Sequence, residues 1–239
     1  MRAGDLVDWV AAGCALLDRR LNRSTGGQAR LLVYEFLEQP VPAVLQSVGH
    51  RDQTRTRIIP FLAADERLVS PELSVAEMVA RFERGDVCLA AFKLGEDGAE
   101  DLAGHLWLTE HAYFEKEANC IFVPSPVARV WWDYHLFVSP RYRGGRLFLR
   151  LWETAQNYLS VRGVVSTISQ VSWTNQISRQ SHRRLGARPI GWAVILRICR
   201  CTFVLSSSLP LLRLSYKRPV RVVLHSTLLG SEGSPMPVA

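Results

Sequence analysis

The spacing of apolar and polar positions predicts a chain in which strands and helices alternate. Apolar residues recur at helical spacing from about Gly4 to Asn22, and a turn or linker follows at Ser24–Gln28. The patterns over residues 30–38, 87–94, 102–111, 128–138, 164–171 and 191–205 are typical of strands. The strand over 128–138 is apolar on both faces, which indicates a central position in a sheet.

Helices are expected over residues 74–86, 146–162 and 174–186, and a short one over Val41–Val48. The first of these has a plausible cap at Ser74 with Glu77 three positions on. Residues 49–73 and 112–127 read as irregular segments, the former with an apolar island at 55–62. Alternation of strand and helix in the second half requires parallel pairing, whereas residues 87–111 form an antiparallel hairpin. The predicted fold class is therefore α/β, with a mixed sheet flanked by helices.

Three segments follow from this order of elements. Residues 1–28 form an amphipathic helix and linker, residues 29–205 the central domain, and residues 206–239 a C-terminal extension. The last part, from Gly230 onward, is expected to be disordered. For the extension three alternatives stay open: it extends the sheet, forms the edge of a homodimer, or touches an anionic membrane peripherally.

Composition supports a globular protein. Hydrophobic residues make up 48% of the 239 residues and charged residues 21%. Asp5 and Asp8 interrupt the N-terminal apolar run, which argues against a secretory signal. The number of cysteines is odd and no CxxC motif occurs, so reduced thiols and a cytoplasmic location are expected. His105, His111 and Cys120 do not have the spacing of a metal site, and no metal is predicted.

Charge is divided unevenly between the two halves of the chain. Residues 1–138 carry 14 Lys and Arg against 20 Asp and Glu, whereas residues 139–239 carry 15 against 2. Such a division predicts an anionic partner for the second half, namely a phosphorylated cofactor, an acidic carrier protein, nucleic acid or a lipid surface. A GC-rich genome explains the surplus of arginine equally well. Nucleic acid is disfavoured, because Trp131 and Trp132 fit a core better than a base-stacking platform.

The most informative stretch is "VSPRYRGGRLFL", residues 138–149. An apolar strand ends here, three arginines surround a Gly-Gly pair, and a helix follows. Amides at a helix N-terminus offer unpaired donors and the positive end of the dipole to a phosphate. Gly144 and Gly145 allow the backbone a close approach, while Arg141, Arg143 and Arg146 can add charge-assisted hydrogen bonds.

Together with "SWTNQISRQSHRRLGA", residues 172–187, this stretch resembles the GCN5-related N-acetyltransferase (GNAT) superfamily. The resemblance covers roughly residues 30–205 and is strongest from Val130 to Ala187. The family joins a strand to a helix through R/Q-x-x-G-x-G/A, whose amides wrap the pyrophosphate of coenzyme A. A later helix carries N-x-x-(A/S)-x-x-x-Y-x-x-x-G-F, to which Asn175, Ser178, His182 and Gly186 correspond. Two departures are Arg146 in place of a small residue and His182 in place of a tyrosine.

The resemblance implies an acetyl-CoA or other acyl-CoA donor and a set of residues that bind it: Phe137, Val138, Arg141, Tyr142, Arg143, Gly144, Gly145, Arg146 and Asn175. The amide near Val138 would polarise the thioester carbonyl, because the strand opens away from its neighbour there. For Asn175 the alternative is a helix N-cap. For Arg146 there are two alternatives: its side chain extends outward to a phosphate, or its bulk prevents tight binding of coenzyme A.

Candidate catalytic residues are His182, Asp133 and His135. His182, with a pKa near its ordinary value, would protonate the departing thiolate; the alternative is a solvent-facing side chain on an arginine-rich helix. Strict alternation places Asp133 and His135 on one face of the central strand together with Trp131 and Phe137. One of the two would then be the base, and the alternative is a satisfied polar pair inside an aromatic core.

Three functions are carried forward. The first is an N-acyltransferase in which a small-molecule amine attacks acetyl-CoA directly in a ternary complex. The second keeps the fold but uses a long-chain acyl-CoA or an acyl carrier protein. The third is a non-catalytic GNAT-like module that binds an anionic ligand or partner. The acceptor pocket is expected from residues 40–75 and 112–127.

Overall fold

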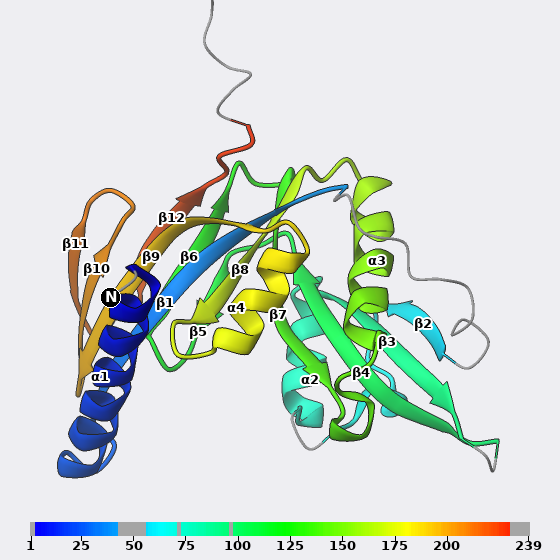
Figure 1. Ribbon diagram of the computed structural model, residues 1–239, viewed down its shortest axis with the longest axis horizontal. Helices are drawn as coiled ribbons and strands as arrows, with labels where there is room; N and C mark the ends of the chain where they lie inside the picture. Colours follow the sequence, from blue (N-terminus) through cyan, green and yellow to red (C-terminus); the bar gives the residue numbers. More distant parts are fainter. Residues whose placement is uncertain (1–2, 43–55, 71–72, 96–97, 230–239) are drawn as a thin grey trace, which may run out of the picture.

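A nine-stranded sheet runs through the whole molecule (Figure 1). The computed structural model describes residues 3–42, 56–70, 73–95 and 98–229. The order of strands is β11-β10-β9-β1-β8-β7-β4-β3-β2. Their bounds are β1 Ala29–Pro40, β2 Thr56–Phe61, β3 Val87–Leu94, β4 Glu100–Thr109, β7 Val130–Val138, β8 Ser166–Ser172, β9 Arg188–Ile198, β10 Cys201–Ser206 and β11 Leu212–Tyr216. β7 and β8 pair in parallel, and the other neighbours are antiparallel.

A second, three-stranded sheet and the helices cover this large sheet. The small sheet has the order β12-β6-β5, with β5 Tyr113–Glu115, β6 Cys120–Ser125 and β12 Val220–His225. The helices are α1 Ala3–Ser24, α2 Val75–Glu83, α3 Leu147–Ser160 and α4 Gln176–Arg184. Short 3-10 turns occur at Glu66–Leu68 and Pro140–Tyr142. The predicted fold class, a mixed sheet flanked by helices, is confirmed.

Each face of the large sheet has its own hydrophobic core. On one face α2 and the small sheet pack over a cluster that includes Phe36, Trp107, Phe122 and Trp132. The rings of Phe122 and Trp132 stack at a centroid distance of 5.7 Å. On the other face α3 buries Leu151, Trp152, Ala155 and Leu159, residues that recur at helical spacing. Below, the face covered by α2 and the small sheet is called the α2 side, and the opposite face is called the α3/α4 side.

Helix capping agrees with the sequence at α2. The side chain of Ser74 accepts a hydrogen bond from the amide of Glu77, as predicted. The apolar island at 55–62 proves to be a strand, β2, which pairs with β3 at the far edge of the sheet. The segment 112–127 was predicted as a loop, and this is wrong: it carries β5 and β6, because Phe122 and Val123 have a core to bury them.

The single long strand predicted over 191–205 is also wrong, since it folds back as the hairpin β9–β10. The turn lies at Cys199 and Arg200, and Cys199 has a φ of 53°. Its sequence contains no Gly, Asn or Asp to signal this left-handed conformation, so the uninterrupted apolar pattern concealed the turn. Cys199 consequently lies in the turn, whereas Cys201 is the first residue of β10. The predicted helix over Val41–Val48 and the tail from Gly230 fall largely or wholly outside the described residues.

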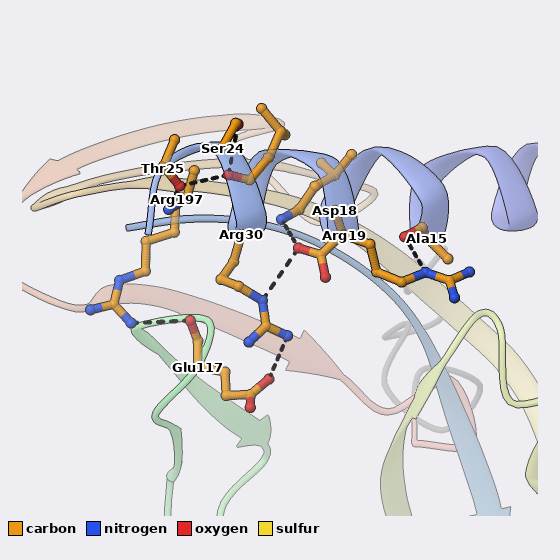
Figure 2. Close-up of polar contacts among 11 residues, drawn as sticks. Ala15, Asp18, Arg19, Ser24, Thr25, Arg30, Glu117 and Arg197 are labelled. Carbon is orange, nitrogen blue, oxygen red and sulfur yellow. Dashed lines mark hydrogen bonds and ion pairs between the residues drawn. The ribbon is translucent and has the colours of Figure 1, made fainter. Parts of the chain in front are cut away.

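α1 lies along the first residues of β1, where that strand extends beyond its pairing with β8 (Figure 1). Asp18 Oδ1 accepts hydrogen bonds from the amide of Leu31 at 2.7 Å and from Arg30 Nε at 3.3 Å. Arg30 also pairs with Glu117 at 3.1 Å, which joins α1 and β1 to the small sheet (Figure 2). No helix among the described residues is long and apolar enough to span a membrane.

The C-terminal segment contributes to both sheets. β11 extends the large sheet, and β12 then crosses to pair in parallel with β6. The buried carboxylate of Glu38 on β1 accepts hydrogen bonds from Ser166, from Ser226 and from both the amide and the hydroxyl of Thr227. These bonds tie the segment after β12 to the centre of the large sheet.

Candidate active site between two diverging strands

The two parallel strands at the centre of the sheet separate partway along their length. Pairing of β7 with β8 runs from Val130 opposite Ser166 to Asp133 opposite Ser169 and then stops. Beyond this point β7 stays paired with β4 as far as Val138, and β8 stays paired with β1. The large sheet therefore has an opening between residues 134–138 of β7 and residues 170–172 of β8.

A β-bulge in β7 lies where this opening begins. His105 of β4 is opposite Phe137, whereas Trp107 is opposite Tyr134, so three residue steps of β7 match two of β4. His135 absorbs the extra residue with a φ of 51°. The strict alternation predicted for this strand is therefore wrong. Asp133 lies on the α3/α4 side, whereas His135 and Phe137 lie beside His105 on the α2 side.

At the end of β7 the backbone groups of one residue, Val138, face the opening. The amide of Ser139 donates to the carbonyl of Ala103 in β4 at 2.9 Å. The N–H and C=O of Val138 therefore point away from β4, because successive residues of a strand alternate in direction. The Val138 carbonyl accepts a hydrogen bond from Arg143 Nε at 2.9 Å. This leaves the Val138 amide at the edge of the opening.

The turn after β7 presents a run of unpaired amides. Pro140–Tyr142 forms a 3-10 turn, Gly144 has a φ of 76°, and α3 starts at Leu147 without a side-chain cap. In the part of the chain that the structure describes, no backbone amide from Gly144 to Leu149 donates a hydrogen bond. These donors, at the positive end of the α3 dipole, are suited to a phosphate group.

The arginines of the turn differ in their surroundings. Arg141 is exposed and lies 3.5 Å from Asp101, which also accepts a hydrogen bond from the hydroxyl of Tyr142. Arg143 donates to the Val138 carbonyl. Arg146 is exposed and makes no hydrogen bond or ion pair to any residue that the structure describes. Its guanidinium is thus available to an anion beside the free amides.

At the point where β7 and β8 separate, three buried polar side chains meet on the α3/α4 side. Ser169 Oγ donates to Asp133 Oδ1 at 2.6 Å and lies 3.4 Å from Nδ1 of His182. The rings of Trp152 and Phe148 from α3 stand edge-on to His182 at 5.6 and 6.3 Å. His182, on α4, is 5% exposed, so the solvent-facing alternative for this residue is wrong.

Burial sets the protonation of this cluster. It lowers the pKa of His182 below its ordinary value, an effect partly offset by the Asp133 carboxylate. The expectation of a pKa near the ordinary value is therefore corrected. Burial likewise raises the pKa of Asp133, against the opposing effects of His182 and of the Ser169 hydrogen bond. Asp133 Oδ2 has no hydrogen-bond partner among the described residues.

α4 is positioned by a buried ion pair and a cap. Glu35 on β1 accepts hydrogen bonds from Arg179 Nε at 2.7 Å and from Arg183 at 2.8 Å. Asn175 is the N-cap, and its side chain accepts the amide of Ser178 at 3.1 Å. The helix-cap alternative for Asn175 is thus what the structure contains, and its amide nitrogen stays available to a ligand.

On the α2 side of β7 a second polar group borders a pocket of about 730 Å³. Arg81 of α2 donates to Nδ1 of His135 at 2.8 Å, and the hydroxyl of Tyr134 donates to Asp86 at 2.6 Å. A guanidinium can only donate, so Nδ1 of His135 is an acceptor and the proton of the neutral ring sits on Nε2. The pocket is lined by Ser74, Glu77, Arg81, Arg84, Asp86, Thr109, Ala112, Tyr113, Phe114, Glu115, Lys116, Glu117 and Tyr134.

Several of these residues were not predicted. Ser169, Glu35 and Arg81 are polar side chains within apolar patterns, and that position was the signal available in the sequence. Which partners they meet depends on pairing between distant strands. Across the described ranges of the chain, no group of three His, Cys, Asp or Glu side chains is arranged to hold a metal ion.

Comparison with solved structures finds distant likenesses. A Drosophila protein shares 13% identity over 78% of this chain and 57% of its own length, with a TM-score of 0.47. A tandem GNAT protein from the clavulanic acid biosynthesis pathway shares 14% identity over 72% of this chain and 55% of its own length, with a TM-score of 0.43. A protein of Novosphingobium aromaticivorans assigned to the GNAT acetyltransferases shares 16% identity over 72% of this chain and 68% of its own length, with a TM-score of 0.44.

The structural neighbours thus include GNAT acetyltransferases at low sequence identity. This chain spans little more than half of the length of the first two proteins. No protein-family model matches the sequence, and no curated protein matches it significantly.

Proposed function

We propose that this protein is an N-acyltransferase that moves an acyl group from a coenzyme A thioester to an amine by direct attack. The observation that carries the proposal is the opening between β7 and β8, bordered by the Val138 amide and followed by a turn of unpaired amides. A donor with a narrow thioester arm and an anionic pyrophosphate matches both features.

The turn fits a pyrophosphate by its chemistry. The amides from Gly144 to Leu149 have no acceptor among the described residues. The space beside Gly145 is open, since a β-carbon added there would meet only the Tyr142 carbonyl oxygen, at 3.6 Å. The amides would bind phosphate oxygens, and Arg146 would add a charge-assisted hydrogen bond from the rim. The Val138 N–H would donate to the thioester carbonyl oxygen, where negative charge develops.

The buried cluster supplies a path for the proton. Because its pKa is lowered, His182 is neutral near pH 7 and can accept a proton from the attacking amine. Asp133 then stabilises the imidazolium, either directly or through the hydroxyl of Ser169. The same proton passes from His182 to the departing sulfur. The carbon–sulfur bond breaks as the carbon–nitrogen bond forms, and a thiol and an amide are released.

The bulge in β7 also determines the proposed roles of His135 and of the pocket on the α2 side. His135 keeps its Nδ1 occupied by Arg81, so it is less suited to be the base than His182 and faces the pocket side instead. The pocket of about 730 Å³ is the proposed seat of the amine. It draws on Ser74 and residues 112–117, segments from which the acceptor pocket was expected.

Two alternative functions remain: an acyltransferase with a different thioester donor, and a non-catalytic module. A long-chain acyl-CoA or an acyl carrier protein would suit the basic second half of the chain. A non-catalytic module that binds an anionic ligand is favoured by Asn175, whose oxygen serves the cap, and by Arg146 in place of a small residue.

Calorimetric titration with acetyl-CoA, a long-chain acyl-CoA and acyl carrier protein tests the proposal. We expect binding of one thioester, and loss of binding in Gly145→Trp, whose side chain would cover the amides. Gly145 is chosen over Gly144 because the φ of 76° at Gly144 would strain any substitution. Gly13→Trp is the control, since it adds equal bulk on α1 in open space.

Each outcome of this titration has a consequence. Failure of all three donors to bind contradicts an acyltransferase and leaves the anionic-ligand module. Preference for the carrier protein replaces the coenzyme A donor. Undiminished binding by Gly145→Trp places the donor elsewhere on the protein.

A further inference from the structure

The end of the large sheet formed by β9, β10 and β11 has one apolar face that the described part of the chain leaves exposed. Three rungs of paired residues form it: Ile198–Cys201–Tyr216, Leu196–Phe203–Leu214 and Val194–Leu205–Leu212. Leu212, Leu214 and Tyr216 are 67%, 65% and 60% exposed, and Phe203, Leu205 and Ile198 are exposed as well. These nine residues are called the apolar sheet face.

The pattern of burial shows that this exposure belongs to one face only. On the opposite side of the same strands Ala193, Ile195, Thr202 and Val204 are buried. Side chains of a strand alternate, so a strand with one buried face ordinarily carries polar residues on the other. Here the solvent face is as apolar as a core, and the β10–β11 turn adds the exposed side chains of Leu209 and Leu211. Such a contiguous patch marks an interaction surface.

Exposed basic residues surround one end of this face. Lys217 donates its amide to the carbonyl of Arg200 at 2.7 Å, so the turns after β9 and after β11 lie side by side. The amide of Cys199 donates to Gln28, which brings the end of α1 to the same place. The basic rim consists of Arg20, Arg23, Arg200, Lys217 and Arg218, none of which has an ion pair within the described ranges.

The segment that carries β9, β10, β11 and their turns has charges of a single sign. Residues 154–231 contain no Asp or Glu. If a second copy of the chain covered the apolar sheet face, the basic rim of one copy would oppose arginines of the other, with no acidic side chain from this segment to pair with them. Like charges across an interface are unfavourable. An anionic lipid surface complements both the leucines and the arginines.

The open edge of β11 limits how deep such a contact can be. Among the residues that the structure describes, β11 is paired in the large sheet only with β10, so its outer edge carries backbone groups without a strand partner there. Unpaired backbone groups are not tolerated in the hydrocarbon core of a bilayer, although they find water and phosphate at its interface. The hairpin is therefore suited to lie flat on the surface and not to cross it.

We propose that the apolar sheet face and the basic rim together form a peripheral docking surface for an anionic lipid bilayer. The leucines and aromatic residues enter the boundary between headgroups and acyl chains, while the rim contacts lipid phosphates. This proposal does not rest on the acyltransferase activity, since none of its residues belongs to the opening or to the turn at 139–146.

Co-sedimentation with vesicles tests it. We expect the full chain to bind vesicles of phosphatidylcholine containing phosphatidylglycerol, and to bind pure phosphatidylcholine about tenfold or more weakly. Salt at about 0.5 M should release the protein, because the charge contribution is screened. Brominated lipid should quench tryptophan fluorescence of the wild type through Trp192, which is exposed beside the apolar sheet face.

Variants separate the two contributions. Leu212→Gln with Leu214→Gln, and separately Lys217→Gln with Arg218→Gln, should each weaken binding about tenfold or more. Leu62→Gln with Val161→Gln is the matched control: both residues are exposed, and Leu62 follows β2 at the opposite edge of the sheet. This control should bind as the wild type does. Circular dichroism verifies that each variant is folded.

Two results would overturn the proposal. One is equal binding of the wild type to neutral and anionic vesicles, or no binding to either, which needs no variant to interpret. The other is a dimer in light scattering that Leu212→Gln with Leu214→Gln converts to a monomer, which would assign the face to a second copy of the chain.

Discussion

The two faces of β7 have opposite character although adjacent residues of one strand build them. On the α3/α4 side Asp133, Ser169 and His182 form a closed, buried chain of hydrogen-bonding groups. On the α2 side Arg81 and Tyr134 border an open pocket, and Arg81 also bonds His135. One extra residue in the strand produces this division, because it turns His135 away from Asp133. A bulge thus gives the strand a proton-handling face and a binding face.

The largest effect on activity should come from interrupting the buried hydrogen-bonded group of Asp133, Ser169 and His182. Ser169→Ala removes the group between Asp133 and His182, and we expect kcat to fall about 100-fold, a loss typical of disabling general acid–base catalysis. Donor affinity should be unchanged, since the side chain of Ser169 contacts Asp133 and His182 and not the turn at 139–146. Steady-state kinetics with the amine found in a substrate screen measure this.

Ser160→Ala is the control, because Ser160 is an exposed serine at the end of α3 and does not border the opening. Equal activity in Ser169→Ala and the wild type would remove the buried chain from the mechanism.

Removing the contacts of Arg81 on the α2 side should lower the stability of the protein. Arg81 is 6% exposed, bonds His135 and Glu77, and lies over the rings of Trp107 and Tyr134. Arg81→Met should lower the free energy of unfolding by about 2 kcal/mol, because His135 loses its buried partner. Urea unfolding provides the measurement.

Arg57→Met removes an arginine from an exposed pair with Glu100 and should cost about 1 kcal/mol or less. If the two variants were equally stable, the α2 face would contribute no more than an ordinary surface pair.

The pH dependence of stability should report on the two buried histidines, His105 and His182. Burial lowers the pKa of His105, on the α2 side, to about 3, and burial also lowers the pKa of His182, where the Asp133 carboxylate opposes the effect. Between about pH 6.5 and pH 3 the unfolded chain binds a proton that folded His105 does not, so stability falls as pH falls. Each such proton contributes at most about 1.4 kcal/mol per pH unit.

His105→Leu should therefore flatten the fall in stability between pH 6.5 and pH 4.5, and His182→Gln should flatten it as well, because both histidines have a lowered pKa. Thermal unfolding across this range measures both slopes, and His111→Gln, at an exposed histidine, is the reference. A steeper slope in His105→Leu than in the wild type would contradict a neutral buried His105.

The smallest effect concerns the bulge itself. At a φ of 51° a β-carbon is unfavourable, so His135→Gly should be more stable than His135→Ala by about 1 kcal/mol. Chemical denaturation of the pair isolates the backbone, because both variants lose the bond to Arg81.

At Phe137, which has no positive φ, the order should be reversed, with Phe137→Ala more stable than Phe137→Gly. A result at His135 that matched the result at Phe137 would mean that the strand is not bulged in solution.

Local patterns predicted much of this fold. Periodicity located α2, α3 and α4, and the cap of α2 followed from Ser74 and Glu77. The glycine-containing turn after β7 was recognised from its residues, and Gly144 does adopt a positive φ. These features depend on neighbours a few residues apart, whose preferences the chain expresses locally.

Non-local features were missed for a physical reason. The turn at Cys199 has no residue type that announces it, and β5 and β6 form only because the large sheet buries them. The bulge at His135 depends on the register between β4 and β7, which no local pattern contains. For the same reason the prediction placed Asp133 and His135 on one face of β7, whereas the bulge places them on opposite faces.

By itself, the sequence determined the alternation of elements, the mixed sheet, the basic second half and the turn with its glycines, since these follow from residue type and spacing. Tertiary structure alone decided that His182 is buried against Ser169, that His135 turns to Arg81, and that the face of β9–β11 stays uncovered. Pairing of strands far apart in the chain sets these contacts, and the free energy of that pairing comes from the whole core and not from any one segment.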